Sequence, residues 1–393
     1  MGKPDIRFKG YTDEWEQRKL IEVCDYVDYR GKTPTKTENG IFLVTAKNVK
    51  DGFIDYETSK EYISENAYEE VMRRGKPEIG DVLITTEAPC GNVAQVNKAD
   101  IALAQRIIKY RGHIGVVDNT YLKYYLLSPE FQKILNAKSS GGTVQGIKGS
   151  ILHQQKIIYP SYEEQKKIGQ HMDSLDHLIT LHQRKCEQTK KMKKYMLQKM
   201  FPQNGAKVPE IRFDGFTYDW EQRKFSELYA RSSEKNDGSI GMDKNITVAT
   251  MQFKNDVKVS TTEYLKTYYT FKLGDIAFEG HQSKEFRYGR FVENDIGNGI
   301  VSHIFAVFRP IQEYDLYFWK YAINNETLMQ RILARSTKAS TMMHDLVTND
   351  FLNETFLVPS VKEQKQIGAF LNKLDNLITL HQRQHKLHLN MLL

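Results

Sequence analysis

Arginine, lysine, glutamine and asparagine side chains gather on a few glycine-containing segments of this sequence, and the chemistry that they offer is hydrogen-bond donation. Such side chains can reach the edges of nucleic-acid bases, whereas contacts to phosphates supply position and affinity only. Glycines in the same segments allow a backbone to approach a groove closely. The residues that we predict to make such contacts are Tyr29, Arg30, Lys32, Lys47, Asn48, Thr143, Gln145 and Lys148 in the first half of the chain, and His281, Gln282, Lys284, Arg287, Arg290, Thr337, Lys338, Ser340 and Thr341 in the second. Ordinary solvated loops are the alternative explanation for the same composition.

Sequence motifs of the common nucleic-acid enzymes do not account for the chain. The Asp/Asn-Pro-Pro-aromatic motif of an N6-adenine methyltransferase does not occur, and Tyr26 stands where a P-loop ending at Gly31-Lys32-Thr33 would need its first glycine. The acidic-x-Lys triplets at 164–166 and 363–365 have a nuclease-like spacing, but they lie in the first turns of expected helices, where glutamate serves as a cap. We therefore predict no catalytic and no cofactor-binding residue, and a solitary nuclease or methyltransferase is the weakest hypothesis.

Three histidines near the end of the sequence are spaced so that they could bind a metal ion. His381, His385 and His388 follow one another at i, i+4 and i+7. His182 occupies the same place in the first half of the chain as His381 does in the second. A position shared by both halves favours packing between helices, so we predict no metal site.

The two halves of the sequence repeat each other at their ends. Residues 4–19 and 209–224 agree at 11 of 16 positions, and residues 165–184 and 364–383 agree at 13 of 20. The stretches between these matched ends differ strongly. A duplication with a period of about 200 residues indicates two domains rather than a solenoid. Similar ends with different middles suggest one scaffold that presents two different contact surfaces.

Composition and charge describe an ordinary protein with a moderately basic balance. The chain has 393 residues, is 40% hydrophobic and 27% charged, and carries a formal net charge of +7. This charge allows a polyanionic partner without proving one. No run approaches the roughly 20 apolar residues of a membrane helix, the N-terminus lacks the apolar core of a signal peptide, and the three cysteines form no CxxC pair. We expect a cytoplasmic protein with no membrane partner.

Each repeat is predicted to contain strands, a helix, and then one long helix. We expect strands at 42–49, 81–88, 246–253, 274–280 and 303–310, and helices at 120–138 and 316–335. The long helices begin after Ser161 and Ser360, and each serine is followed three residues later by glutamate, which is the capping-box spacing. The first runs to about Met200, and its roughly 38 residues would span about 57 Å.

The long helices carry apolar residues at heptad spacing, strongest in their first turns. Helices of this length cannot hide such a stripe inside their own small domains, so we expect them to pair with each other. Because the chain returns after the first helix, we expect the pair to be antiparallel. The predicted fold class is α+β: two similar globular domains, 1–160 and 204–359, separated by an antiparallel two-helix coiled-coil spacer, 161–203 and 360–393, with pseudo-two-fold symmetry.

These motifs make the chain resemble the specificity subunits of type I restriction-modification enzymes. The resemblance rests on the duplicated WEQRK segments at 15–19 and 220–224, the P-S-x-x-E-Q-K helix starts, and the twin LITLHQR segments. It covers the whole chain and includes the order of the parts. It implies two target-recognition domains that each read one half of a bipartite DNA sequence, with the helix pair setting the gap. It also implies a non-catalytic subunit.

The resemblance further implies partners and cofactors. The partners are double-stranded DNA, two methyltransferase subunits, the restriction and translocase subunits, and inhibitor proteins that mimic DNA. S-adenosylmethionine, ATP and magnesium belong to the partner subunits, so no cofactor is expected in this chain. Because the middles of the repeats differ, the expected target is asymmetric. The main alternative is a coiled-coil scaffold or adaptor protein that does not bind DNA.

Overall fold

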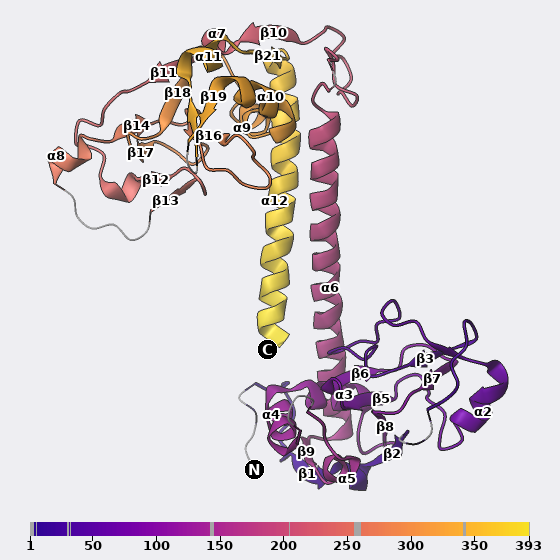
Figure 1. Cartoon of the computed structure of the whole chain (residues 1–393). Helices are drawn as coiled ribbons and strands as arrows, with labels where there is room; N and C mark the ends of the chain where they lie inside the picture. The colour runs from indigo at the N-terminus through magenta and orange to yellow at the C-terminus, as the bar shows by residue number, and fades with distance from the viewer. Residues whose placement is uncertain are drawn as a thin grey trace. The chain divides into compact units, whose positions relative to one another are not determined.

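The computed structural model describes residues 4, 6–29, 31, 33–141, 145–203, 205–254, 261–340 and 343–392. These residues form two compact units. The first comprises Met1–Ile179 together with Leu387–Leu393, and the second comprises Thr180–Lys386. Each unit contains one of the predicted globular domains, and the elements of both are labelled in Figure 1. No helix among the described residues is both long and apolar enough to cross a lipid bilayer.

A four-stranded antiparallel sheet forms the centre of the first unit, with strand order β2-β8-β5-β6, and a three-stranded sheet lies in the order β4-β3-β7. The central strand β5 is buried along its whole length. Its side chains alternate between the two faces: Val82 and Ile84 pack with α3, α4 and α5, whereas Leu83 packs with the three-stranded sheet. The elements are β1 (Glu16–Lys19), α1 (Leu20–Val23), β2 (Cys24–Asp28), β3 (Ile41–Val44), β4 (Tyr62–Ile63), α2 (Tyr68–Val71), β5 (Val82–Thr86), β6 (Cys90–Gln95), β7 (Ile101–Leu103), β8 (Ile107–Gly112), α3 (Asn119–Leu127), α4 (Pro129–Lys138), α5 (Gly149–His153) and β9 (Lys156–Tyr159).

The second unit repeats the four-stranded sheet, in the order β11-β18-β15-β16, but its remaining described sheets have two strands each. Its core is unusually aromatic, and the rings of Phe225 and Phe351 stack with centroids 4.4 Å apart. Two similar domains of mixed helix and sheet are therefore confirmed. The elements are β10 (Glu221–Lys224), α7 (Phe225–Leu228), β11 (Tyr229–Ser232), β12 (Ile246–Thr247), β13 (Gln252–Phe253), α8 (Thr262–Leu265), β14 (Tyr269–Phe271), β15 (Ile276–Glu279), β16 (Arg290–Glu293), β17 (Gly299–Val301), β18 (Ala306–Pro310), α9 (Leu316–Ile323), α10 (Glu326–Ser336), β19 (Thr337–Ala339), β20 (His344–Leu346), α11 (Thr348–Asn353) and β21 (Thr355–Val358).

A short antiparallel ribbon connects the first matched segment of each repeat to the start of its long helix. β1 pairs with β9, and β10 pairs with β21 in the same manner. Both first strands have the sequence EQRK. The strands β9 and β21 lead directly into the long helices. The ribbon therefore brings residues about 140 positions apart in the sequence next to each other in each repeat.

A buried arginine–glutamate ion pair lies beside each ribbon. Arg7 donates from Nε and Nη2 to Glu164 at 2.8 and 2.7 Å, and Arg212 donates in the same way to Glu363 at 2.7 and 2.9 Å. The two glutamates are 0% and 1% exposed, so water cannot hydrogen-bond to their carboxylates. The arginines supply the hydrogen bonds and the compensating positive charge instead. The capping-box role predicted for these glutamates is therefore wrong, because their carboxylates bind arginines from the beginning of the repeat.

The glutamine that follows each glutamate holds another part of the domain. Gln165 Oε1 accepts from the backbone N–H of Asp118 at 2.9 Å, and Gln364 Oε1 accepts from that of Asp315 at 3.1 Å. Both aspartates cap the N-termini of α3 and α9. One turn further along the long helix, a Cβ at Gly368 would lie 2.2 Å from Asp315 Oδ1. A glycine is needed there because the start of α9 approaches the helix so closely.

The predicted long helices are confirmed as α6 (Tyr162–Lys199) and α12 (Val361–Leu392). Not all of their apolar positions serve a helix–helix seam. Ile367, Leu371 and Leu374 of α12 pack into the core of the second domain. The first turns of this helix are therefore part of the globular core.

Within the second unit, α6 and α12 contact each other in antiparallel directions. His182 Nδ1 lies 3.2 Å from His381 Nδ1, and Lys193 Nζ lies 2.7 and 2.8 Å from the two carboxylate oxygens of Asp375. Moving toward the end of α6 thus leads toward the beginning of α12. The interhelical packing predicted for His182 and His381 is confirmed.

Two predicted helices are in fact helix pairs. The helix expected at 120–138 is divided into α3 and α4 at Ser128, whose hydroxyl accepts from the N–H of Phe131 at 3.3 Å, and Pro129 begins α4. A residue before proline avoids the helical conformation. The helix expected at 316–335 is similarly divided into α9 and α10, with the Asn325 side chain capping α10.

All five predicted strands are shorter than expected, and turns shorten three of them. The segment 246–253 forms two short strands, β12 and β13, which pair with each other. β3 ends at Val44 because a turn follows, and β18 begins only at Ala306. In each of these places a local turn interrupts a run of residues with high strand propensity.

The Arg212–Glu363 pair should be worth more to the second unit than an exposed pair. We expect Arg212→Ala to lower its free energy of unfolding by about 3–5 kcal/mol, because an uncompensated carboxylate remains buried. Lys266→Ala, which breaks the exposed ion pair with Glu263, is the matched control and should cost at most about 1 kcal/mol. Urea unfolding followed by tryptophan fluorescence measures both, and equal losses for the two variants would contradict the assignment.

Candidate nucleic-acid interface

The glycine-rich loop of the first unit, residues 139–150, is attached through its described residues to the end of the central strand β5. Ser140 and Gly146 exchange backbone hydrogen bonds of 2.9 and 3.0 Å, which close the base of the loop. The N–H of Ile147 donates to the carbonyl of Thr86 at 2.9 Å, and Gly146 forms a β-bridge with Glu87. The loop therefore lies beside the point where β5 ends.

The corresponding loop of the second unit is attached in the same way. β19 and β20 form a hairpin, and Ser340 donates from its backbone N–H to Met343 at 2.8 Å. His344 donates to the carbonyl of Gly280 at 2.8 Å, and His281 forms a β-bridge with Met343. The β19–β20 hairpin is thus attached to its central strand as the glycine-rich loop of the first unit is, and Glu87 and His281 occupy corresponding places.

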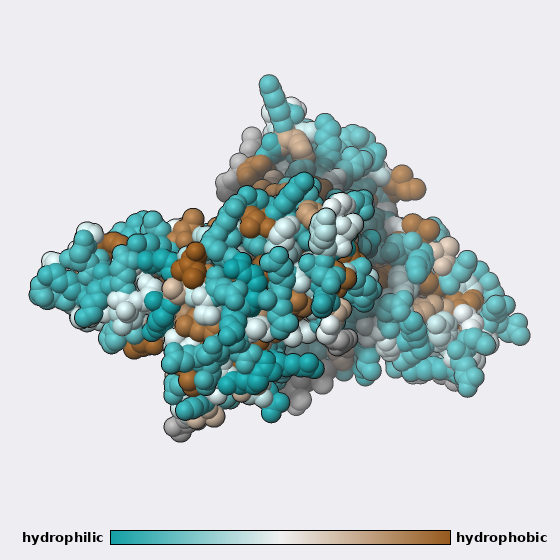
Figure 2. Space-filling model, turned by 90° about the horizontal axis from the view of Figure 1, so that it is seen from above, coloured by the Kyte–Doolittle hydropathy of each residue, from teal (hydrophilic) through white to brown (hydrophobic). Residues whose placement is uncertain are grey.

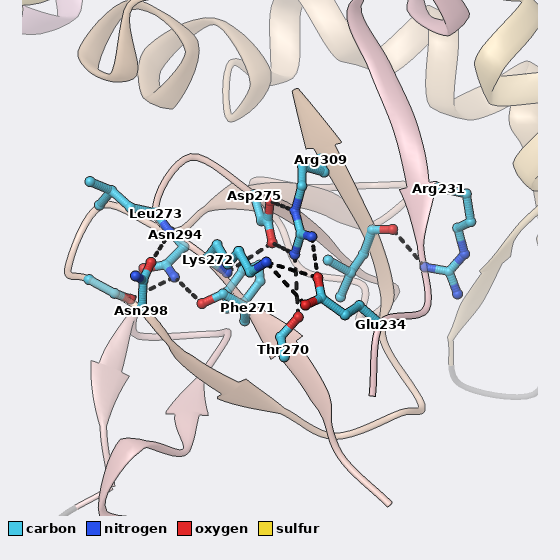
Figure 3. A network of polar contacts seen from close by, with 12 residues as sticks. Arg231, Glu234, Thr270, Phe271, Lys272, Leu273, Asp275, Asn294, Asn298 and Arg309 are labelled. Atoms are coloured by element: carbon cyan, nitrogen blue, oxygen red, sulfur yellow. Dashed lines mark hydrogen bonds and ion pairs between the residues drawn. The ribbon is translucent and has the colours of Figure 1, made fainter. Parts of the chain in front are cut away.

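An ion-pair network holds the opposite end of the central strand in the second unit (Figure 3). Arg309 of β18 donates to Asp275, just before β15, at 2.9 Å from both Nε and Nη2, and it also contacts Glu234. Hydrogen bonds from Arg309 and Lys272 lower the pKa of Glu234 to about 2. This network fixes the start of β15, whereas His281 follows its end.

The first unit has the equivalent network around Asp81, which precedes β5. Arg111 donates to Asp81 at 2.6 and 2.9 Å, and Lys109 Nζ lies 3.2 Å away. Burial alone would raise the pKa of Asp81, but hydrogen bonds from Arg111 and the Glu78 backbone, together with the charges of Lys109 and Arg111, lower it below its usual value. At about 3.3 Å per residue, the networks and the loops are separated by the length of one strand, roughly 13–17 Å. The charged side chains of these two networks therefore lie too far from the loops to form ion pairs with the loop side chains.

Two predicted contact residues of the first unit serve its own fold. The Tyr29 hydroxyl donates to the carbonyl of Gly75 at 2.5 Å in a buried position. Asn48 is fully buried; its side-chain oxygen accepts from Thr45 and its amide donates to carbonyls of the 55–59 segment. Both side chains are therefore occupied by hydrogen bonds within the domain.

The remaining described candidates of the first unit are exposed. Lys47, Gln145 and Lys148 lie on the surface, and none makes an ion pair with another described residue. Lys148 lines a depression of about 540 Å³ that also contains Gln105 and Arg106. Gln105 donates to the hydroxyl of Thr33 at 3.1 Å, which joins Thr33 to the same surface. No contact in the described structure connects Lys47 to this surface.

In the second unit, some predicted contact residues are exposed and make no ion pair, whereas others bond to the domain itself. His281, Gln282, Lys284, Arg287 and Lys338 are exposed and make no ion pair with the described part of the chain.

Arg290 instead donates to Glu279 at 2.7 Å, and the hydroxyls of Thr337 and Ser340 donate to backbone carbonyls of the domain. The free side chains come from the β15–β16 connection and the β19–β20 hairpin, which meet at Gly280.

Four predicted contact residues, Arg30, Lys32, Thr143 and Thr341, lie outside the described residues. Sequence inspection also missed candidates. Glu87, Gln105 and Arg106 line the same depression as Lys148. Their only sequence signal is that they flank strands, because their proximity arises from strand pairing.

Most of the predicted contact residues are polar and exposed. Figure 2 shows a face on which hydrophilic side chains predominate and hydrophobic ones are scattered. Within the described ranges, no group of three or more histidine, cysteine, aspartate or glutamate side chains is arranged to hold a metal ion. The arrangement offers hydrogen-bond donors and positive charge on loops that a rigid sheet positions.

Comparison with known protein families gives a match in both repeats. The profile of the family described as type I restriction modification DNA specificity domain matches residues 12–191 and again residues 218–390. The two matches cover most of the chain and coincide with the internal duplication.

Curated relatives carry related descriptions. The MjaVIII specificity subunit of a type I restriction enzyme from Methanocaldococcus jannaschii is 28% identical over 197 residues, which are 47% of this chain and 45% of the relative. The MjaIX specificity subunit from the same organism is 31% identical over 172 residues, or 42% and 39%. The match spans less than half of the length of these relatives.

A solved structure has the same fold over nearly the whole chain. The crystal structure of the S subunit of a type-I restriction-modification system from M. genitalium aligns with a TM-score of 0.60 at 13% identity. The alignment covers 98% of this chain and 95% of the other. At this level of identity the likeness shows the fold alone.

A buried carboxyl group should give the second unit an unusual dependence on pH. Glu293 of β16 is 3% exposed, and neither of its oxygens has a hydrogen-bond partner in the described structure. Burial, followed by the charge of Asp295, raises the pKa of Glu293 well above its ordinary value. The folded state therefore retains a proton that the unfolded chain loses above about pH 4–5, and stability falls as pH rises toward the folded pKa.

We expect Glu293→Gln to remove this fall in stability with rising pH, because glutamine does not titrate. The difference in unfolding free energy between variant and wild type should then grow with pH, by up to about 1.4 kcal/mol per pH unit. Urea unfolding at several pH values between 5 and 8, followed by tryptophan fluorescence, to which Trp220 and Trp319 of the same core contribute, measures the difference. Glu313→Gln, at an exposed position, should run parallel to wild type. A parallel curve for Glu293→Gln as well would contradict the prediction.

Proposed function

Because this chain belongs to the family of type I restriction-modification DNA specificity domains, we propose that it is the subunit that recognises DNA sequence for such a system. In this proposal each globular domain reads one half of a bipartite target. The chain itself carries no catalytic residue, and it directs methyltransferase and restriction subunits to the site.

The observation that carries the proposal is one scaffold with two different sets of exposed donors. Both units have the same strand order in their four-stranded sheets and the same loop attachment at the end of the central strand. On the loops there, the first unit presents Gln145 and Lys148, whereas the second presents Lys338 on its hairpin and Lys284 on the β15–β16 connection. Different side chains in one geometry suit two half-sites of different sequence, so the proposed target is asymmetric.

The long helices supply a spacer in this proposal. Their antiparallel contacts in the second unit, such as Lys193 with Asp375, support a coiled-coil pair with approximate two-fold symmetry between the repeats. A pair of helices resists compression, so it would give the two half-sites a constant gap. Base-edge contacts would provide roughly 1–3 kcal/mol of discrimination per bidentate pair.

The partners belong to the same proposal. They are double-stranded DNA, two methyltransferase subunits that use S-adenosylmethionine, restriction subunits that use ATP and magnesium, and inhibitor proteins that mimic DNA. A coiled-coil scaffold that does not bind DNA is the alternative, supported only by the helix contacts. A gel shift with duplex DNA and the methyltransferase subunits present distinguishes them, since the scaffold predicts no sequence-specific complex.

The direct test is methylome sequencing of cells that contain the whole system. We expect one bipartite motif with two different half-sites and a fixed gap. Cells that lack only this chain are the control and should lose the motif. A short motif without a gap would contradict the proposal, and so would an unchanged motif in the control cells.

Lys284 and Lys338 should contribute to affinity through phosphates or bases. We expect each alanine variant to weaken binding, and replacing a lysine that contacts a phosphate should reduce the magnitude of the slope of log K against log salt by about 0.9. Fluorescence anisotropy at several salt concentrations measures this with the assembled methyltransferase complex. Lys266→Ala, remote from the loops in sequence and paired with Glu263, is the control; affinities indistinguishable from wild type for both loop variants would remove these residues from the interface.

A further inference from the structure

The depression beside the glycine-rich loop of the first unit is built by three segments distant in the sequence. Glu87 follows β5, Arg106 precedes β8, and Lys148 follows the loop. Because β5 and β8 pair antiparallel with Thr85 opposite Ile107, Glu87 and Arg106 lie at the same edge of the sheet. The depression is thus lined by a carboxylate, a guanidinium and an ammonium group.

Glu87 and Arg106 form an ion pair that contributes little to the stability of the fold. Arg106 Nε lies 3.3 Å from Glu87 Oε2, and the side chains remain 48% and 44% exposed. Ion pairs with this exposure contribute little to stability. By contrast, Asp81 in the framework network is almost completely buried. Glu87 and Arg106 therefore keep hydrogen-bonding capacity for a ligand.

The backbone around this pair is held in an unfavourable conformation. Arg106 has a φ of +74° and Ala88 has a φ of +50°, both in the left-handed region that residues with a Cβ disfavour. The carbonyl of Arg106 accepts from the N–H of Thr86 at 2.9 Å, which holds the strained turn in place. Such strain is found where a side chain must be presented in a particular direction.

The hydrogen-bonding pattern of the pair selects one base pair. An arginine fork requires two adjacent acceptors, and a glutamate next to it requires a donor. In the major groove a G·C pair presents guanine N7 and O6 as acceptors followed by the N4 amino donor of cytosine. An A·T pair presents acceptor, donor, acceptor, and therefore does not match.

We propose that Arg106 and Glu87 read one G·C base pair in the half-site contacted by the first domain, with Arg106 donating to guanine N7 and O6 and Glu87 accepting from cytosine N4. This inference rests on the proposed function and names part of its target. Lys148, exposed and without an ion pair in the described structure, is placed to contact the adjacent phosphate backbone.

The second domain does not present this combination. His281 occupies the place of Glu87, since each forms the β-bridge to its loop. The Arg290–Glu279 pair is more buried, and Arg290 also donates to the carbonyl of Ala249 at 2.8 Å. The proposal therefore applies to one half-site only.

The test measures base preference in the assembled methyltransferase complex. Glu87→Gln introduces an amide that can donate as well as accept, and Arg106→Lys keeps the charge but loses the fork. Binding is measured on duplexes in which each base pair of both half-sites is replaced in turn. We expect both variants to lose about 5- to 150-fold of the preference for G·C at one and the same position, with all other positions unchanged.

Glu57→Gln is the matched control, because Glu57 belongs to an exposed ion pair with Lys60 in the same domain. It should keep the wild-type preference at every position. Melting curves of the variants establish that the first domain is folded before binding is compared.

Several results would overturn the inference. Unchanged preference in both variants would leave the pair as surface structure only, and a uniform loss of affinity on all sequences would make Arg106 a phosphate contact. A wild-type target in which neither half-site contains a G·C pair would exclude the inference without any variant. If wild type recognises no bipartite motif, the proposed function fails, and this inference with it; if the motif exists but the variants leave it unchanged, only the inference fails.

Discussion

The buried carboxylates of Glu164 and Glu363 need a compensating charge, and the rest of each repeat is arranged around the arginine that supplies it. A carboxylate without access to water is costly unless it is paired and hydrogen-bonded. Arg7 and Arg212 can satisfy it only if the first residues of the repeat return to the start of the long helix. The β-ribbon and the capped helix α3 or α9 follow from that single requirement.

The position of this framework explains how the two domains can differ so much in sequence between their matched ends. The arginine–glutamate pairs, the ribbon and the networks around Asp81 and Asp275 hold the beginning of each central strand and the helix. The loops of the candidate interface are attached at the end of that strand by backbone hydrogen bonds to residues such as Thr86 and Gly280. Gly280 itself must remain glycine, because a Cβ there would lie 2.1 Å from the carbonyl oxygen of His344. The exposed side chains of the loops take no part in these backbone bonds, so they can change without disturbing the charges on which folding depends.

Much of this architecture was predictable from the sequence, because the duplication and the long amphipathic helices leave strong periodic signals. The predictions that were wrong relied on a local sequence pattern where a residue distant in the sequence determines the contact. Glu164 stands at the capping-box position, but its carboxylate is bound by Arg7, 157 residues away. The proline at 129 was visible and should have divided the predicted helix, since the residue before it avoids the helical conformation.

The candidate site was predictable only as a set of loops, because a polar side chain in a loop has two competing uses. Asn48 and Tyr29 satisfy backbone groups that would otherwise be buried without a partner, and leaving such groups unpaired costs about 1–3 kcal/mol each. Side chains that the fold requires in this way are not available to contact a ligand. Glu87 and Arg106 are 19 positions apart and meet only through the pairing of β5 with β8, so no local pattern marks them. The side chains left exposed are those that the fold can do without, and for that reason they are also the ones that can differ between two copies of the same scaffold.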